Sequence, residues 1–113
     1  MTKAKLEDNN RLKKRKDFTK VYKKGRSLSG KSVVLCYRKT TEPNFRVGFT
    51  VSKKVGKAVT RNKVRRRLKE ICRLHQGAFS PWHDYVLIAR RGCDSTPYQA
   101  LTKEVLSLAK RVK

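Results

Sequence analysis

The sequence predicts a small protein of mixed α/β (α+β) class, in which helices pack on one central sheet. Residues 45–52 alternate between apolar and other side chains, and residues 84–91 are almost continuously apolar, so both stretches have the pattern of strands. Residues 57–75 and 96–108 carry apolar side chains at helical spacing. Because 113 residues suffice for one modest core, we expect a single domain over residues 1–113.

Charge is the most unusual property of the composition. Lysine and arginine number 31 against 8 acidic residues, which gives a formal charge of +23. Such an excess destabilises a compact chain by self-repulsion, so it indicates a polyanionic partner. Nucleic acid is the first candidate, since neutralising phosphates releases counterions, and an anionic membrane surface is a weaker one. No apolar run approaches the roughly 20 residues of a spanning helix, and residues 1–5 lack the apolar core of a signal peptide.

The three cysteines, Cys36, Cys72 and Cys93, are odd in number and widely spaced, which argues against a disulfide framework. We expect them to be small buried side chains in a reducing, cytoplasmic setting. A zinc site that adds His75 and His83 to Cys72 and Cys93 is the alternative. Only the Cys72-x-x-His75 spacing supports it, and the remaining spacing matches no compact ligand pattern.

Residues 1–13 are polar and charged and predict a flexible basic arm. A short helix is expected next, because Phe18, Val21 and Tyr22 fall at i, i+3 and i+4, and Gly25 follows two lysines as a stop. The aromatic face of this helix packs into the core, which is the interpretation favoured by the tendency of aromatic residues to be buried. Alternatively, it borders a groove where bases stack.

Two strands are predicted after this helix, over residues 32–38 and 45–52, with a turn at residues 41–44. In the second strand one face carries Phe45, Val47, Phe49 and Val51, and the other carries Arg46, Gly48, Thr50 and Ser52. The latter face has no bulky side chain except Arg46. It either faces solvent or forms the floor of a shallow groove, since Gly48 permits the close approach of another backbone.

Residues 53–73 contain ten basic residues and a single acidic one, Glu70, whereas a solvated helix usually mixes both signs. An apolar stripe nevertheless runs along this stretch, formed by Val64, Leu68, Ile71 and His75. We therefore predict a helix that packs through this stripe and presents a cationic outer face, which we hypothesise binds RNA.

The helical wheel arranges the polar side chains of this stretch. Arg61, Arg65 and Lys69 form a row on one flank, and Asn62, Arg66 and Arg73 lie beside that row. Glu70 is expected to form a weak exposed pair with Arg66 or Arg67.

The remaining elements follow from similar signals. Gly77 is expected to end the basic helix, and Trp82 to cover the edge of the core. Residues 84–91 predict a central strand. Thr96, Pro97 and Gln99 have the pattern of an N-cap, a first helical turn and a capping box for the last helix.

The eight acidic residues are scattered, with no Asp-x-Asp or Glu-x-x-His arrangement, so the pattern predicts no catalytic residue and no metal ligand in this chain.

Residues 57–70, Lys-Ala-Val-Thr-Arg-Asn-Lys-Val-Arg-Arg-Arg-Leu-Lys-Glu, closely resemble the signature helix of the bacterial ribonuclease P protein subunit. The core of that motif is Arg-Asn-Arg, and Lys63 stands at its third position, which keeps the charge but loses a bidentate fork. Other landmarks follow in family order: residues 12–18, residues 46–54 and residues 85–90.

The resemblance implies a two-layer α/β sandwich of order α-β-β-β-α-β-α. Its central sheet is mostly antiparallel, and the basic helix forms a left-handed β-α-β crossover. The resemblance also implies the protein subunit of a ribonucleoprotein endonuclease. Its partners are a catalytic RNA and precursor tRNA, with no membrane and no dedicated protein partner. The catalytic RNA removes the 5′ leader with Mg²⁺, which is held mainly by the RNA components.

The resemblance also assigns two sets of binding residues. The catalytic RNA is expected to contact Lys53, Lys54, Lys57, Arg61, Asn62, Lys63, Arg65, Arg66, Lys69 and Arg73. The single-stranded leader is expected in a cleft between the first helix and the open sheet face, lined by Phe18, Tyr22, Val34, Cys36 and Thr50. Two alternatives from the residues remain: a structural ribosomal protein or another small RNA-binding protein, and a helix that binds specific DNA sequences.

Overall fold

The computed structural model describes residues 10–112 and has the predicted α+β class. The helices are α1 (Arg15–Lys24), α2 (Ala58–Leu74) and α3 (Tyr98–Lys110), with two short 3-10 helices, η2 (Gln76–Ala78) and η3 (Cys93–Ser95). The strands are β1 (Arg26–Ser29), β2 (Val33–Lys39), β3 (Arg46–Thr50) and β4 (His83–Ala89). The order α-β-β-β-α-β-α is therefore confirmed.

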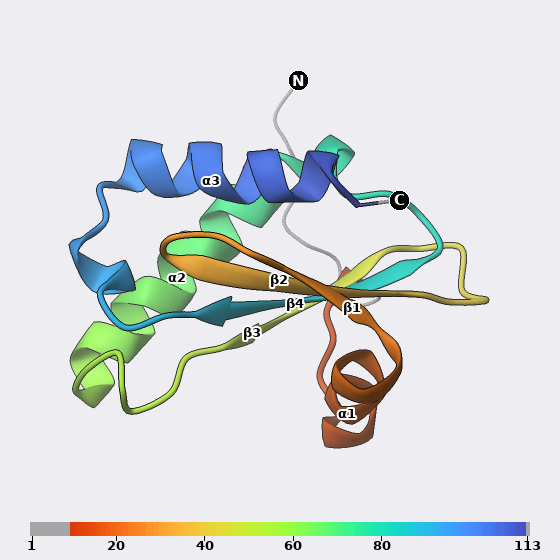
Figure 1. The fold of residues 1–113 in the computed structure, drawn as a ribbon, viewed down its shortest axis with the longest axis horizontal. Helices are drawn as coiled ribbons and strands as arrows, with labels where there is room; N and C mark the ends of the chain where they lie inside the picture. Colours follow the sequence, from red (N-terminus) through yellow and green to blue (C-terminus); the bar gives the residue numbers. More distant parts are fainter. Residues whose placement is uncertain (1–9, 113) are drawn as a thin grey trace.

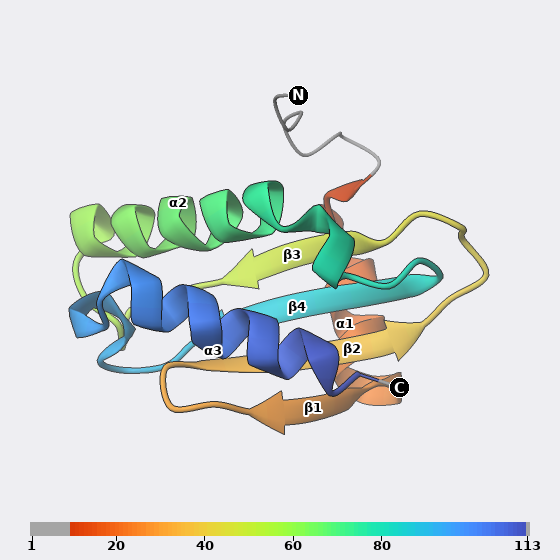
Figure 2. The same ribbon diagram turned by 90° about the horizontal axis from the view of Figure 1, so that it is seen from above.

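The four strands form one mixed sheet in the order β1-β2-β4-β3. The pairs β1–β2 and β2–β4 are antiparallel, and β3–β4 is parallel, so the sheet is mostly antiparallel as expected. Parallel neighbours need a crossover, and α2 supplies it between β3 and β4. In Figure 2 the helices lie in front of the sheet, and β3 and β4 both run from right to left, with β4 below β3. With the strands turned to point upward, β4 therefore lies to the left of β3. The crossover through α2 is left-handed, the rare hand for such a connection.

Helices α2 and α3 cover one face of the sheet, while α1 crosses the opposite face (Figure 1). The main core lies under α2 and α3, where Leu68, Leu87 and Leu101 are fully buried. The predicted apolar face of residues 45–51 packs into this core, which confirms its alternation. Strand β4 is central, and Ile88 is its only residue that is not buried.

A smaller apolar cluster fills the space beneath α1. It contains Leu12, Val21, Cys36 and Val86, with Phe18, Val34 and Ile88 packed around them. Helix α1 ends as predicted at Gly25, whose N–H donates to the carbonyl oxygen of Val21 at 2.9 Å. A side chain at position 25 would place its Cβ 2.4 Å from the carbonyl oxygen of Tyr37, so only glycine fits between α1 and β2.

The end of the predicted flexible arm lies along the outer edge of β3. The Leu12 N–H donates to the Val47 carbonyl oxygen at 3.0 Å, and Asn10 Nδ2 donates to that of Phe45 at 2.7 Å. An edge strand presents unpaired carbonyl groups, and Leu12 adds a buried side chain, so residues 10–12 pack along β3. The flexibility of the arm stays a prediction. Residues 1–9 lie outside the described residues.

The predicted capping box of the last helix is wrong. Pro97 is the N-cap residue of α3, and no side chain caps the helix. The Thr96 hydroxyl instead pairs with the hydroxyl of Ser32 at 2.6 Å. Glu104 in α3 reinforces this link, because its Oε2 accepts the backbone N–H groups of Ser32 and Val33, each at 2.8 Å. These bonds tie α3 to the start of β2. They join residues that are far apart in the sequence, so a local capping pattern does not predict them.

Short β1 was not assigned from the residue pattern, because its side chains are mostly exposed and show no apolar alternation. No helix in the described part of the chain is long and apolar enough to cross a bilayer.

We predict that Glu104→Ala destabilises the fold by about 2–3 kcal/mol, because two backbone N–H groups lose a charged acceptor. Urea denaturation measures the change. The neighbouring Lys103→Ala, an exposed position, should stay within about 0.5 kcal/mol of the unmodified chain. Equal stability of the two variants would contradict the role given to Glu104.

Candidate RNA interface

Helix α2 separates a buried stripe from a cationic surface. Val64, Leu68, Ile71 and Cys72 are buried against the sheet, which confirms the first three positions of the predicted stripe. The prediction that His75 is the fourth residue of the stripe is wrong. The helix ends at Leu74, and His75 is its half-buried C-cap residue with φ −124° and ψ 42°. The change of backbone angles takes His75 out of helical spacing, and Cys72 completes the stripe instead.

The predicted row of Arg61, Arg65 and Lys69 lies half-buried along α2. Burial lowers the pKa of Lys69, and the nearby cations Arg11 and Arg65 lower it further. Arg11 pairs with the edge of β3, so the row lies close to the segment that runs beside this strand. Like charges held this closely would be stabilised by a bound anion.

Two further contacts shape the row. Arg65 Nη1 donates to Asn62 Oδ1 at 2.9 Å, which holds the guanidinium against the helix. Arg61 Nε is buried and has no hydrogen-bond partner among the described residues. A buried N–H donor without an acceptor costs free energy.

The single acid of this surface pairs differently from the prediction. Glu70 forms its ion pair with Arg73, one turn later, and not with Arg66 or Arg67. The hydrogen bond between the two side chains raises the pKa of Arg73 and lowers that of Glu70. The charge of Arg73 is therefore shared with a carboxylate, whereas Arg66 forms no ion pair within residues 10–112.

The remaining predicted RNA contacts lead into α2 or project from it. Lys53 and Lys54 are exposed in the turn after β3, which buried Val55 anchors to the core. Lys57 is the N-cap residue, and no acidic residue lies in the first helical turn. Lys57 thus places positive charge at the positive end of the helix dipole, which an anion would relieve. Lys63 is exposed further along the helix.

The other candidate surface lies on the α1 side of the sheet. Register pairs Val34 with Ile88 and Ile88 with Thr50, so these three residues form one row across β2, β4 and β3. The Tyr22 hydroxyl pairs with the Thr50 hydroxyl at 2.8 Å, and the Tyr22 side chain is 45% exposed. The row and the ring of Tyr22 therefore border the same surface.

The neighbouring row consists of Cys36, Val86 and Gly48. A Cβ on Gly48 would lie 2.4 Å from Phe18 Cζ, so the glycine admits the Phe18 ring directly onto the sheet. The sequence predicted that Gly48 would admit another backbone segment, whereas an aromatic side chain fills this space. The Phe18 and Tyr22 ring centroids are 6.4 Å apart, and Phe18 is only partly buried, so it both packs on the sheet and borders the surface.

The structure thus brings the five predicted cleft residues to one face, but their exposure differs. Cys36 is only 8% exposed, and burial raises the pKa of its thiol. Tyr22, Thr50 and half-buried Val34 offer more surface to a ligand.

Two residues of this surface were missed from the sequence. Ile88 lies between Val34 and Thr50, and exposed Arg90 follows it at the next position of the same alternation, where its Nη1 donates to the Gly30 carbonyl oxygen at 2.7 Å. Alternation along residues 84–90 places both on the α1 side. What the sequence lacks is the strand order that puts β4 between β2 and β3.

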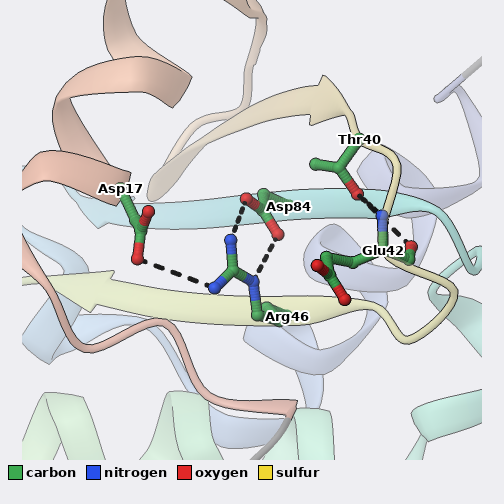
Figure 3. A network of polar contacts seen from close by, with 5 residues as sticks. All are labelled: Asp17, Thr40, Glu42, Arg46 and Asp84. Carbon is green, nitrogen blue, oxygen red and sulfur yellow. Dashed lines mark hydrogen bonds and ion pairs between the residues drawn. The ribbon is translucent and has the colours of Figure 1, made fainter.

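A charged network fastens α1 to this face (Figure 3). Arg46 Nε and Nη2 donate to the Asp84 carboxylate at 2.9 and 2.7 Å, and Arg46 Nη1 lies 3.6 Å from Asp17 in α1. The hydrogen bond to Asp84 raises the pKa of Arg46. The network holds the first turn of α1 and therefore positions Phe18, the residue after Asp17.

The residues of the zinc alternative do not gather. Within residues 10–112, no three His, Cys, Asp or Glu side chains form a group that could hold a metal ion. Cys72 and Cys93 are buried free thiols, and burial raises the pKa of Cys93 to about 11.

Comparison with known proteins agrees with this geometry. The model of the Ribonuclease P family matches residues 6–113. The ribonuclease P protein component of Alkaliphilus metalliredigens is 41% identical over 108 residues, covering 96% of this chain and 97% of the relative. The component of Clostridioides difficile is 45% identical over 101 residues, covering 88% and 89%.

Solved structures share the fold. The RNase P protein of Thermotoga maritima superimposes with a TM-score of 0.84 at 33% identity, covering 91% of this chain and 97% of that one. The RNase P protein of Staphylococcus aureus gives 0.81 at 31% identity, covering 89% and 93%. With a family model that matches nearly the whole chain and relatives of this identity, the chain belongs to the ribonuclease P protein family.

Proposed function

We propose that this chain binds the catalytic RNA of ribonuclease P and the single-stranded 5′ leader of precursor tRNA, and so assists Mg²⁺-dependent removal of the leader. The observation that carries the proposal is the surface of α2. A helix with a fully buried apolar stripe presents a row of cations and only one carboxylate, Glu70, which is already paired. Such a surface is suited to a rigid polyanion.

The α2 surface would dock the catalytic RNA. The crowding of Lys69 by Arg11 and Arg65 and the acid-free first turn of α2 are each unfavourable in the isolated protein. RNA phosphates would relieve both, because they supply negative charge. Since α2 is held by its buried stripe, its cations are positioned before the RNA arrives.

The leader would lie on the α1 side of the sheet. The exposed ring of Tyr22 and the partly exposed ring of Phe18 offer stacking surfaces for unpaired bases. The Thr50 hydroxyl offers hydrogen bonds, and Arg90 offers a cation for the backbone. Stacking is tolerant of sequence, because every base has an aromatic face.

The protein's part in the reaction would be binding and positioning. Mg²⁺, when bound, would neutralise phosphate charge and support the hydrolysis, and we place it mainly on the RNA phosphates. The cationic protein would also reduce repulsion between the catalytic RNA and its substrate. Three buried free cysteines agree with a reducing, cytoplasmic setting.

The test is reconstitution at low Mg²⁺. Addition of the protein to the catalytic RNA should restore cleavage of precursor tRNA under ionic conditions in which the RNA alone is slow, since added cations replace part of the screening that Mg²⁺ provides. Release of the leader is followed over time. No stimulation of cleavage, despite binding of RNA, would indicate a structural RNA-binding protein and defeat the proposal.

We predict that Arg61→Ala and Arg65→Ala each weaken binding of the catalytic RNA and reduce the slope of log K against log salt by about one. Binding titrations over a range of salt concentrations measure the slope. Lys103→Ala on α3 removes the same charge from an exposed position outside this surface and is the matched control. A slope that matches the control would place the two arginines outside the interface.

We predict that Tyr22→Ala weakens binding of precursor tRNA by about 5- to 150-fold, the equivalent of one lost stacking contact, and leaves mature tRNA unaffected. Tyr22→Phe keeps the ring but loses the hydroxyl that bonds Thr50, so it separates stacking from the hydrogen bond. Holoenzyme affinities for the two RNAs supply the comparison. Equal losses on both would remove Tyr22 from the leader site.

A further inference from the structure

A further basic surface lies on the α1 side. It contains none of the predicted binding residues, although Arg11 on its border lies close to the α2 row. It is a hollow of about 750 Å³ bounded by α1 and the residues before it, the end of β2, the loop after β2 and the first residue of β3. Eight of its lining residues are basic and two are acidic, and none is aromatic. The hollow therefore suits negative charge rather than bases.

The acidic residues do little to cancel this charge. Asp17 already lies in the network of Arg46, whose guanidinium is also held by the buried Asp84 (Figure 3). Arg46 on the floor of the hollow is therefore already held by two carboxylates. Among the described residues no carboxylate forms an ion pair with four cations of its walls, Lys16, Lys20, Arg38 and Lys39.

Helix α1 separates this hollow from the leader surface. Lys16 and Lys20 are each two residues before an aromatic ring, Phe18 and Tyr22, and two residues turn a helix by about 200°. The lysines therefore lie on the opposite side of α1 from the rings. Charge at the hollow and stacking at the leader surface can be altered independently.

The basic surface also extends along α1. A smaller hollow of about 410 Å³ shares Arg38 and Lys39 with the first and adds Lys24 and Arg26 at the far end of the helix. A single small anion needs neither this length nor this many cations. An extended series of phosphates matches both.

We propose that the larger hollow binds the sugar-phosphate backbone of an RNA strand, without reading its sequence. The inference rests on the proposed function. The phosphates come either from the part of the leader beyond the stacking surface or from the catalytic RNA. Both RNAs present the same sugar-phosphate backbone. They are distinguished by whether binding depends on the length of the leader.

The test uses the full chain with Lys16→Ala and Lys20→Ala combined. Both side chains are exposed, and alanine favours a helix, so the fold is retained. The control combines Lys103→Ala and Lys110→Ala, which removes equal charge from exposed positions of α3. Lys39→Ala, from the opposite wall, is an independent variant. Holoenzyme affinity for precursors with short and long leaders and protein affinity for the catalytic RNA are measured against salt.

The double α1 variant should lose about 5- to 30-fold in affinity, with a salt slope lower by about 0.7 per lysine for single-stranded RNA. If affinity falls only for precursors with long leaders, the bound phosphates belong to the leader. If affinity for the catalytic RNA falls and the leader length makes no difference, they belong to the catalytic RNA. Behaviour equal to the α3 control in every assay overturns the inference while the proposed function stands. Failure of the unmodified chain to bind either RNA overturns both.

Discussion

The buried carboxylate of Asp84 is the constraint on which the arrangement of the sheet and α1 depends. Asp84 lies near the start of the central strand and is 1% exposed, so its charge must be paired within the protein. The parallel register places Arg46 of β3 directly opposite it, and the guanidinium satisfies both carboxylate oxygens. The remaining guanidinium nitrogen reaches Asp17 of α1. One arginine thus joins two strands and a helix (Figure 3).

This link explains how one small sheet presents separate surfaces. Held at its first turn, α1 crosses the sheet with Phe18 on Gly48 and Val21 in the small cluster beneath it. Its aromatic side borders the candidate leader surface, and its lysine side borders the basic hollow. Helix α2 occupies the opposite face, yet its cationic row lies close to Arg11 at the edge of β3. The edge strand therefore lies close to both candidate RNA surfaces.

Four of the six acidic residues in the described part of the chain are structural links. Asp84 and Asp17 hold Arg46, Glu104 accepts two backbone N–H groups, and Glu70 pairs with Arg73. Asp17, Asp84 and Glu104 are scattered along the sequence because each one links a different pair of structural elements. Most cations remain exposed or half-buried around an uncharged core. The described cations therefore keep most of their charge at the surface, where it is available for a partner.

The sequence by itself determined the features that depend on local periodicity. The stripe of Val64, Leu68 and Ile71, the alternation of residues 45–51 and the stop of α1 at Gly25 are all confirmed. The tertiary structure decided which strands are neighbours. That order places Ile88 between Val34 and Thr50 and draws Thr96 to Ser32 instead of the helix it precedes. Periodicity fixes which face a side chain occupies, but contacts between distant segments are set only when the sheet assembles.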